Sequence, residues 1–524
     1  VLPERVDVGD VSGGAGGHAV SRLREVLALH GVDHLGDLRG GVAAVELLAA
    51  APGFAELESD HRAAWHRLWG RFHLEFVDGP DDAPAAVETL RTLRLSAFHL
   101  LQTVSPHTLD IDAGIPARGL HGEAYRGHVF WDELFVFPVL TLRLPGLARA
   151  LLYYRVRRLD AARRGARAAG YTGAMYPWQS GSDGREETQL VHLNPRSGRW
   201  LPDTSHLQRH VGLAVAHNVW QYYQATGDGE FLADRGAEVL LEVARFFAGL
   251  ATLDPVRDRY RIRGVMGPDE YSTRYPGAAE PGIDDNAYTN VLTVWVLLRA
   301  RDVLAVLPAT RRAELLESLG LEPVELLRWE DVSRRMYVPI AEDGVISQFE
   351  GYRELPELDW DDYRRRYGDI QRLDRILEAE GRSVDDYQVS KQADVLMLFY
   401  LFSADELREL LERLGYGLAP EAIPRTIEYY TARTAHGSTL SALVLAWVLA
   451  RMDREQALEP FERALRSDLA DIQGGTTAEG IHLGSMAGCV DLVLRCFAGL
   501  ETRRDALWFN PHWPRRFGPL SLAV

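Results

Sequence analysis

The chain has 524 residues, of which 46% are hydrophobic and 9% aromatic, and its formal net charge is −17. This composition supports a large folded core and argues against wholesale disorder. The acidic balance also argues against binding to a nucleic-acid backbone, although a local cationic pocket could still take a small anion. No stretch is long and apolar enough for a transmembrane helix, and no basic start precedes an apolar run. We therefore expect a cytoplasmic protein without a membrane or nucleic-acid partner.

In chain order, residues 1–40 are rich in Gly, Val and Asp, and we interpret them as an N-terminal segment or the remnant of a preceding domain. Residues 41–85 predict a helical linker, because apolar residues recur three and four positions apart. Residues 86–505 contain roughly twelve amphipathic or buried helical segments with few strand patterns between them. Helices in antiparallel pairs without a fixed sequence period favour an α/α barrel over a solenoid. Residues 506–524 predict a linker entering a C-terminal β domain.

The two cysteines, Cys489 and Cys496, lie seven residues apart in an apolar helical stretch. Two helical turns hold their Cα atoms too far apart for a disulfide. We expect buried thiols in a reducing compartment.

The loops between the predicted helices are unusually rich in Trp, Tyr, His, Asp, Glu and Gly, as in RGLHGEAYRGHVFWDE and YPWQSGSDGREET. Aromatic rings can cover the apolar faces of sugar rings, and carboxylates and amides bind hydroxyl groups. Loops of this chemistry on a rigid helical scaffold favour carbohydrate binding. We expect no metal site, because HGEAYRGH has two histidines seven apart and no HExxH or CxxC occurs.

The segment GVMGPDEYS contains the sharpest catalytic candidate, Glu270. Gly267 and Pro268 predict a turn. Met266 and Tyr271 flank the acidic pair, and an apolar pocket there would favour the protonated carboxyl that a general acid needs. The alternative is an ordinary exposed carboxylate in a turn.

Two further loops contain hydroxyl groups and histidines directly before predicted helices. HGSTLS, residues 436–441, opens one helix, and GTTAEGIHLGSMAG places His482 before another. Backbone N–H and side-chain O–H groups at a helix start can hold a phosphate. The simpler interpretation of Ser438 is a helix N-cap.

Lys391 is the only lysine among the 58 lysines and arginines. Lysine is a compact point charge on a thin stem, whereas arginine is a wide planar fork. One interpretation is a pocket too narrow for a guanidinium group. Chance, or a structural pair with Asp394 or Asp386, is the alternative.

Together these motifs resemble glycoside hydrolase family 65, which includes maltose, trehalose, kojibiose and nigerose phosphorylases and some hydrolases. The matching segments occur in order between about residue 90 and about residue 500: HGEAYRGHVFWDE, PWQSGSDGREET, GPDEY, DDNAYTN, QFEGY, KQADV, HGSTLS and GTTAEGIHLGSMAG. The chain departs from the family in three ways. We expect the large β-sandwich before the barrel and the small sheet domain after it to be largely missing, and Thr431 stands where phosphorylases often have the Glu of YYEP.

The resemblance implies an all-α catalytic core, an (α/α)6 barrel with the active site at its mouth, and inversion at an α-glucoside. Glu270 would be the general acid. The glucose of the non-reducing subsite and the phosphate would contact two further groups of residues: Trp131, Asp132, Lys391 and Gln392 for the glucose, and Ser438, Thr439 and His482 for the phosphate. The partners implied are a disaccharide and inorganic phosphate as co-substrate, without a cofactor. Relatives also suggest a possible homodimer.

Phosphorolysis to β-glucose 1-phosphate is the first hypothesis from this resemblance. A hydrolase of trehalose or kojibiose is the second, and it would need a catalytic base, for which Glu350 and Glu479 are the candidates. A carbohydrate-binding protein without catalysis is the third. The glycosidic linkage and the acceptor sugar stay open.

Overall fold

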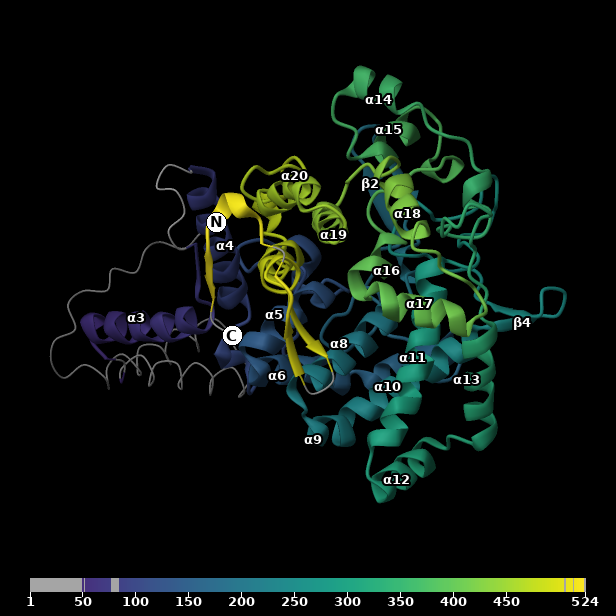
Figure 1. Cartoon of the computed structure of the whole chain (residues 1–524), viewed down its shortest axis with the longest axis horizontal. Helices are drawn as coiled ribbons and strands as arrows, with labels where there is room; N and C mark the ends of the chain where they lie inside the picture. Colours follow the sequence, from purple (N-terminus) through teal and green to yellow (C-terminus); the bar gives the residue numbers. More distant parts are fainter. Residues whose placement is uncertain (1–49, 51, 77–83, 504–505, 512, 523–524) are drawn as a thin grey trace, which may run out of the picture. The chain divides into compact units, whose positions relative to one another are not determined.

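The computed structural model describes residues 50, 52–76, 84–503, 506–511 and 513–522 (Figure 1). The predicted N-terminal segment, residues 1–40, lies outside them. The chain divides into two units, Val1–Arg71 and Phe72–Val524. The first contains one described helix, α3 (Phe54–Arg71). The division at Arg71 falls inside residues 41–85, the range predicted to be one helical linker.

Six helices form the inner layer of the second unit and are buried along nearly their whole length. Helices that are buried on all sides are typical of the inside of a core. They are α5 (Glu133–Arg143), α8 (Val211–Thr226), α11 (Ala287–Val306), α16 (Leu396–Leu401), α19 (Thr439–Ala450) and α21 (Leu483–Asp491).

The starts of these inner helices contact one another in series. The ring of Trp131, directly before α5, lies 5.1 Å from the ring of His210, directly before α8. The His210 ring in turn lies 5.6 Å from the ring of Tyr288 in the first turn of α11. Asn286, the N-cap of α11, donates to the carboxylate of Asp394 before α16 at 3.0 Å.

The remaining contacts close this series into a ring. The carbonyl of Lys391, before α16, accepts the Gly437 N–H before α19 at 2.9 Å. A Cβ placed on Gly484, in the first turn of α21, would lie 3.3 Å from both Leu440 of α19 and Asp132 at the start of α5. All six inner helices therefore begin at the same end of the barrel. The positive ends of their dipoles meet there, which favours an anionic ligand.

An outer layer of helices packs on the inner ring and completes the (α/α)6 barrel, which confirms the predicted fold class. The outer helices are α4 (Pro84–Thr103) against α21, α6 (Pro145–Arg157) against α5 and α8, α10 (Ala237–Leu250) against α8 and α11, α13 (Pro323–Arg335) against α11, α17 (Ala404–Arg413) against α11 and α16, and α20 (Arg454–Leu465) against α19 and α21. Further helices are α7 (Leu159–Ala168), α9 (Gly229–Phe231), α12 (Ala309–Leu319), α14 (Trp360–Tyr367), α15 (Leu373–Ala379) and α18 (Ala422–Thr431).

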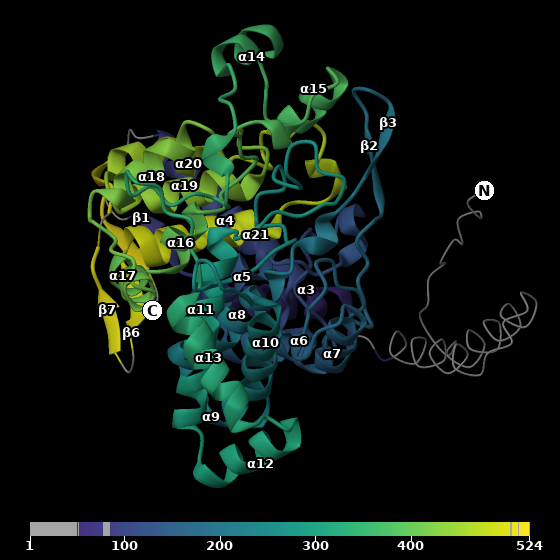
Figure 2. The same ribbon diagram turned by 90° about the vertical axis from the view of Figure 1, so that its right-hand side faces the viewer.

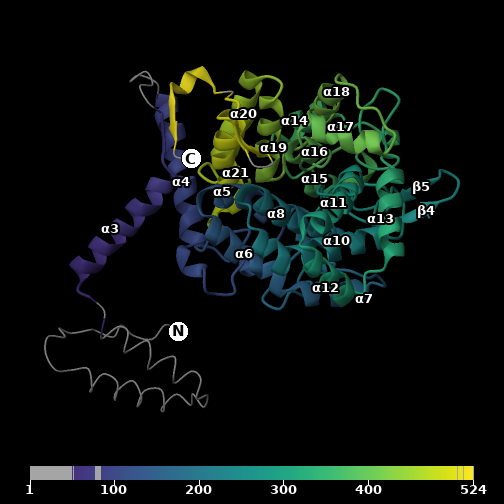
Figure 3. The same cartoon turned by 60° about the horizontal axis from the view of Figure 1, so that its bottom comes forward.

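The described strands form small antiparallel pairs at the edges of the barrel. They pair β1 (Leu74–Phe76) with β8 (Leu520–Leu522), β2 (Val191–Asn194) with β3 (Arg199–Pro202), β4 (Thr252–Asp254) with β5 (Arg259–Arg261), and β6 (Leu500–Arg503) with β7 (Ala506–Phe509). The β2–β3 hairpin reaches α15 (Figure 2), where the Asn194 amide donates to the Arg375 carbonyl at 3.0 Å. The β4–β5 hairpin protrudes from the barrel (Figure 3).

The sequence predicts buried free thiols and no transmembrane helix. Cys489 and Cys496 are buried free thiols, as expected, and burial raises the pKa of Cys496 to about 12. Among the described residues, no helix combines the length and the apolarity that crossing a membrane requires.

Candidate active site

The GPDE turn is held by a buried carboxylate, Asp269, next to the candidate acid. Asp269 accepts the backbone N–H of Lys391 at 2.7 Å and the side-chain amide of Gln348 at 3.0 Å. Burial raises the pKa of Asp269 to about 6. A Cβ on Gly267 would lie 2.2 Å from an Asp394 oxygen, so only glycine fits there. The contacts of the buried Asp269 side chain therefore fix the turn, and Glu270, the residue after Asp269, extends from a rigid backbone.

Glu270 forms an ion pair with Lys391. The Nζ atom of Lys391 lies 2.5 Å from the Oε2 atom of Glu270, and their side chains are 14% and 36% exposed, respectively. The expectation of an apolar pocket around Glu270 is wrong. The turn buries Asp269 and leaves the Glu270 side chain partly exposed, beside the ammonium group of Lys391. Lys391 contacts neither of the two carboxylates considered for it, Asp394 and Asp386, and its partner comes from 121 positions earlier in the chain.

Asp394 has a structural position below the turn. It accepts the Asn286 amide at 3.0 Å and the Asp269 N–H at 3.3 Å. Burial, and then the charge of Asp269, raise the pKa of Asp394 to about 8. Asp394 and Asp269 are therefore two neighbouring buried carboxyl groups with raised pKa values beneath the candidate acid.

Trp131 and Gln392, which are predicted to bind glucose, have packing partners in this structure. Trp131 is 3% exposed and contacts Phe135 edge-on at 5.7 Å between ring centroids. The side-chain amide of Gln392 donates to the Pro268 carbonyl and so steadies the GPDE turn. Their contacts with a sugar stay predictions.

Asp132 lies at the N-terminus of α5 and links the two halves of the site. Burial raises its pKa to about 7; the positive charge of Arg118 opposes this rise and the negative charge of Glu270 adds to it. Asp132 is therefore within electrostatic reach of both groups. Its predicted role as a ligand of glucose hydroxyls is untested.

The HGSTLS loop has the local geometry of a helix start. Ser438 is the N-cap of α19, and its Oγ accepts the Leu440 N–H at 3.3 Å. His436 adopts a left-handed φ of 55°, and its Nδ1 lies 2.9 Å from the Ser441 hydroxyl. Thr439 is buried in the first turn. The N-cap interpretation of Ser438 is thus correct, and its contact with phosphate stays a prediction.

His482 is held by the carboxylate of Asp468, a residue outside the predicted site. The Nδ1 atom of His482 lies 2.7 Å from Asp468, whose other oxygen accepts the His482 backbone N–H at 2.9 Å. Burial pushes the pKa of Asp468 upward, but the hydrogen bonds and charge of His482 outweigh it and lower this pKa. Asp468 and His482 are fourteen residues apart, and no local motif connects them.

Arg118 is a second residue of the site that the sequence patterns do not single out. Its guanidinium donates to the carbonyls of Gly480 at 2.7 Å and Thr476 at 3.2 Å, and lies 3.5 Å from His482 Nδ1. No carboxylate among the described residues forms an ion pair with Arg118. The RGLHGEAY loop that contains it stood out for its composition, but its single arginine gave no signal of its own.

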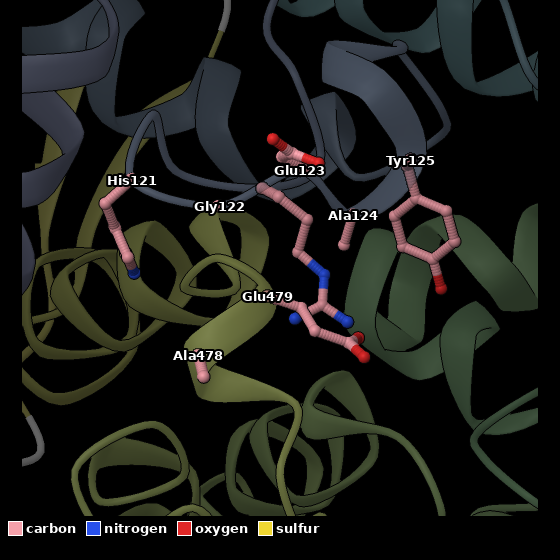
Figure 4. A pocket seen from close by; sticks show the side chains of 8 residues that line it. His121, Gly122, Glu123, Ala124, Tyr125, Ala478 and Glu479 are labelled. Carbon is pink, nitrogen blue, oxygen red and sulfur yellow. The ribbon is translucent and has the colours of Figure 1, made fainter. Parts of the chain in front are cut away.

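A cavity of about 620 Å³ opens beside Arg118. In Figure 4 the loop from His121 to Tyr125 lies on one side and Ala478 with Glu479 on the other. A Cβ on Gly122 would lie 2.0 Å from the Glu479 carbonyl, so glycine lets the two loops meet. The cavity is lined by Arg118, His121, Gly122, Glu123, Ala124, Tyr125, Ala478 and Glu479.

The two candidate bases of a hydrolase differ in position. Glu350 accepts the Tyr337 hydroxyl at 2.7 Å and lies 2.5 Å from Arg257, in the turn between β4 and β5. Both of its oxygens are therefore occupied. Glu479 lines the cavity and forms no ion pair with a described residue, so it is the better placed of the two.

Comparison with known proteins gives a consistent result. A family model described as the glycosyl hydrolase family 65 central catalytic domain matches residues 94–491. The chain is 61% identical over 484 residues to an uncharacterized glycosyl hydrolase of Mycobacterium tuberculosis, covering 92% of this chain and 36% of that protein. It is 40% identical to a trehalose 6-phosphate phosphorylase of Lactococcus lactis subsp. lactis, covering 90% and 59%.

Two further relatives extend this comparison. A kojibiose phosphorylase of Halothermothrix orenii is 34% identical, with 91% of this chain and 58% of that protein covered. The solved structure of a proposed kojibiose phosphorylase from the human microbiome has a TM-score of 0.74 at 23% identity, covering 93% of this chain and 65% of that one. That likeness shows the fold. The chain spans between about a third and three fifths of the length of the curated relatives.

Proposed function

The chain belongs to glycosyl hydrolase family 65, and we propose that it cleaves an α-glucosidic disaccharide by inverting phosphorolysis. The substrate would be of the maltose, trehalose, kojibiose or nigerose type, and the products β-glucose 1-phosphate and a free sugar. The names of the Lactococcus and Halothermothrix relatives support phosphorolysis. These names leave open whether the leaving sugar is neutral or phosphorylated. The proposed reaction uses inorganic phosphate as co-substrate and needs no cofactor.

One observation supports this proposal: an acid, Glu270, and a cation without a carboxylate partner among the described residues, Arg118, both lie at the end of the barrel where six helices begin. Glu270 supplies the carboxyl, and Arg118 with His482 supplies donors for an anion. The charges of both Glu270 and Arg118 act on the pKa of Asp132, which supports assigning the two groups to one site. A phosphorylase requires this combination, because phosphate takes the place of a second catalytic carboxylate.

The proposed reaction balances as follows. Glu270 donates its proton to the glycosidic oxygen while an oxygen of the phosphate attacks C1 of the glucose from the other face. The bond from C1 to the leaving oxygen breaks, and the leaving sugar departs with the proton. When glucose hydroxyls take over the Lys391 ammonium group, Glu270 loses its ion pair and takes up from solvent the proton that it then donates. The attacking hydrogen phosphate releases its own proton to solvent once the bond to C1 has formed, so no net proton is consumed. After transfer, Lys391 can stabilise the carboxylate again.

Hydrolysis on the same scaffold is the alternative, and the position of Glu479 favours it over the non-catalytic hypothesis. Glu479 lines the cavity and could hold a water molecule as a general base. The carboxylates of Glu270 and Glu479 would then divide the acid and base roles.

A panel of glucose disaccharides, incubated with and without inorganic phosphate and followed by NMR, tests the proposal. Phosphate-dependent formation of β-glucose 1-phosphate supports phosphorolysis and identifies the linkage. Release of free β-glucose at the same rate without phosphate would overturn it in favour of hydrolysis. A Glu479→Gln variant separates the two mechanisms further, because only a hydrolase should lose most of its rate.

A further inference from the structure

A single segment, residues 385–394, holds the chain on both sides of Glu270. Before the acid, Asp269 accepts the Lys391 backbone N–H at 2.7 Å and donates its own N–H to Asp394 at 3.3 Å. The residues before Glu270 are therefore fixed to the same segment that carries Lys391, its ion-pair partner.

Asp385, at the start of this segment, fixes the residues after Glu270. Its Oδ1 atom accepts the backbone N–H groups of Thr273 at 2.7 Å and Arg274 at 3.2 Å. Its Oδ2 atom accepts the Thr273 hydroxyl at 3.1 Å and the Ser383 hydroxyl at 2.9 Å. Because hydrogen bonds to an ionised carboxylate are stronger than those between neutral groups, this half-buried side chain is a firm anchor.

The two anchors close a short path of chain around the Glu270–Lys391 pair. Glu270 lies three positions before Thr273, and Asp385 lies six positions before Lys391. Short segments that are joined at both ends have few conformations left. The distance of 2.5 Å between Lys391 Nζ and Glu270 Oε2 therefore depends on both anchors. Loss of the Asp385 anchor would leave the candidate acid held on one side, and a displacement of about 1 Å at a reacting group can cost about a hundredfold in rate.

We propose that Asp385 is a positioning residue for the candidate acid, because it fixes the chain after Glu270 and so aims the carboxyl at the glycosidic oxygen. Asp385 acts through Thr273 and not by contact with the substrate. This inference rests on the proposed role of Glu270 as the general acid.

Two substrates that differ in their need for a proton test the inference. Asp385→Ala removes both anchoring oxygens and should lower kcat on the disaccharide that the substrate panel identifies by about ten- to a hundredfold. With α-glucosyl fluoride, whose fluoride leaves without a proton, kcat should stay within about threefold of wild type. Asp385→Asn keeps Oδ1 as an acceptor for the backbone N–H groups and should restore kcat on the disaccharide to within about threefold of wild type.

Asp228→Ala is the matched control. Asp228 is also half-buried, and it accepts the Phe231 N–H and the Tyr222 hydroxyl, each at 2.9 Å. It follows the end of α8 and therefore lies at the opposite end of the barrel from Glu270. Asp228→Ala should leave the ratio of the two kcat values unchanged. An equal fall of kcat on both substrates in Asp385→Ala would show a general structural role and overturn the inference, while the phosphate dependence of the wild type stands.

Thr273→Val provides a milder change if Asp385→Ala does not fold. It removes the hydroxyl that donates to Asp385 and keeps the backbone N–H and the shape of the side chain. It should lower kcat on the disaccharide by a few-fold and leave kcat on α-glucosyl fluoride as it is, as for loss of one hydrogen bond to a charged group. Unchanged kcat on the disaccharide would contradict the positioning role.

Lys391 reports on the same contact without catalysis, because it is the only lysine of the chain. The protein is treated with acetic anhydride, and acetylation of Lys391 is followed by mass spectrometry of its peptide. The ion pair protects the amine, so Glu270→Gln, which breaks the pair directly, is the positive control. Asp385→Ala should raise the acetylation rate by about two- to fivefold, the range for a partly exposed ion pair, whereas Asp228→Ala should not change it.

The acetylation rate separates the inference from the proposed function. If the wild type turns over no disaccharide with phosphate, the proposed function fails, and acetylation then decides the role of Asp385. A rate that rises in Asp385→Ala and stays at the wild-type value in Asp385→Asn supports the positioning role. Equal rates in the wild type and Asp385→Ala overturn it.

Discussion

The proposed chemistry starts from the contact between the Glu270 carboxylate and the Lys391 ammonium group. Glu270→Gln should lower kcat on the disaccharide substrate by about 10²- to 10⁴-fold, because an amide has no proton to give to the glycosidic oxygen. α-Glucosyl fluoride, whose fluoride leaves without protonation, should lose far less. Steady-state kinetics on both substrates check this. Disaccharide turnover within a few-fold of wild type would refute Glu270 as the acid.

A second prediction concerns Asp468, which we regard as a positioning residue for His482. Asp468→Asn keeps the shape of the side chain but weakens its hold on the imidazole, whose Nδ1 lies 2.7 Å away. KM for inorganic phosphate should rise by about tenfold, while KM for the disaccharide should change little, as for loss of one charge-assisted hydrogen bond. Asp405→Asn, on the exposed start of α17, serves as control. A parallel rise in both KM values would indicate general damage rather than loss of phosphate positioning.

At the scale of elements, the loops before the inner helices carry the site because each one ends where a rigid helix begins. Gly437 shows how closely they approach, since a Cβ there would meet the Gln371 carbonyl at 2.3 Å and Lys391 Cγ at 3.0 Å. Gly437→Ala should therefore push Lys391 away from Glu270 and lower kcat/KM by at least about tenfold, and overpacking should cost about 1–3 kcal/mol of unfolding free energy. Gly417→Ala, which meets nothing within 4 Å, is the matched control. Kinetics and denaturant unfolding of both variants check this, and unchanged kinetics in Gly437→Ala would contradict the packing argument.

At the scale of the whole molecule, three buried aspartates make the free energy of unfolding depend on pH. Burial raises the pKa of Asp269, Asp132 and Asp394 to about 6, 7 and 8, from 3.8 for an ordinary aspartate. Between the ordinary and the raised value, the folded state holds a proton that the unfolded chain has released. Burial lowers the pKa of His210, His217 and His436 to about 3, 3 and 4, which opposes this trend below the ordinary histidine value of 6.5. The free energy of unfolding should therefore fall as pH rises from about 6.5 through about 8, where Asp132 and Asp394 still titrate.

Denaturant unfolding at about pH 7 and about pH 8.5, where histidines are neutral in both states, measures this slope. Asp394→Asn should reduce the difference in unfolding free energy between the two pH values, because an amide does not titrate. Asp405→Asn changes the same charge on the surface and should leave the difference as it is. A wild-type stability that rises over this range would show that the sign of the argument is wrong.

Most of the fold follows from local patterns, and less of the site does. Apolar periodicity predicts the helices, and the polar loops before α11, α19 and α21 predict where functional groups gather, because both signals depend on neighbours in sequence. The pairing of Lys391 with Glu270 spans 121 positions, and that of Arg118 with His482 spans 364. No spacing rule reaches that far.

The amino-acid order alone therefore specified a helical barrel, buried thiols and the loops in which Glu270, Lys391 and His482 lie. Packing of distant segments settled what local patterns left open. It buried Asp269 rather than Glu270, paired Glu350 with Arg257, placed Asp468 against His482, and left Arg118 without a carboxylate partner among the described residues. The physical reason is that burial and ion pairing depend on which side chains meet in three dimensions, whereas periodicity and capping depend on a few consecutive residues.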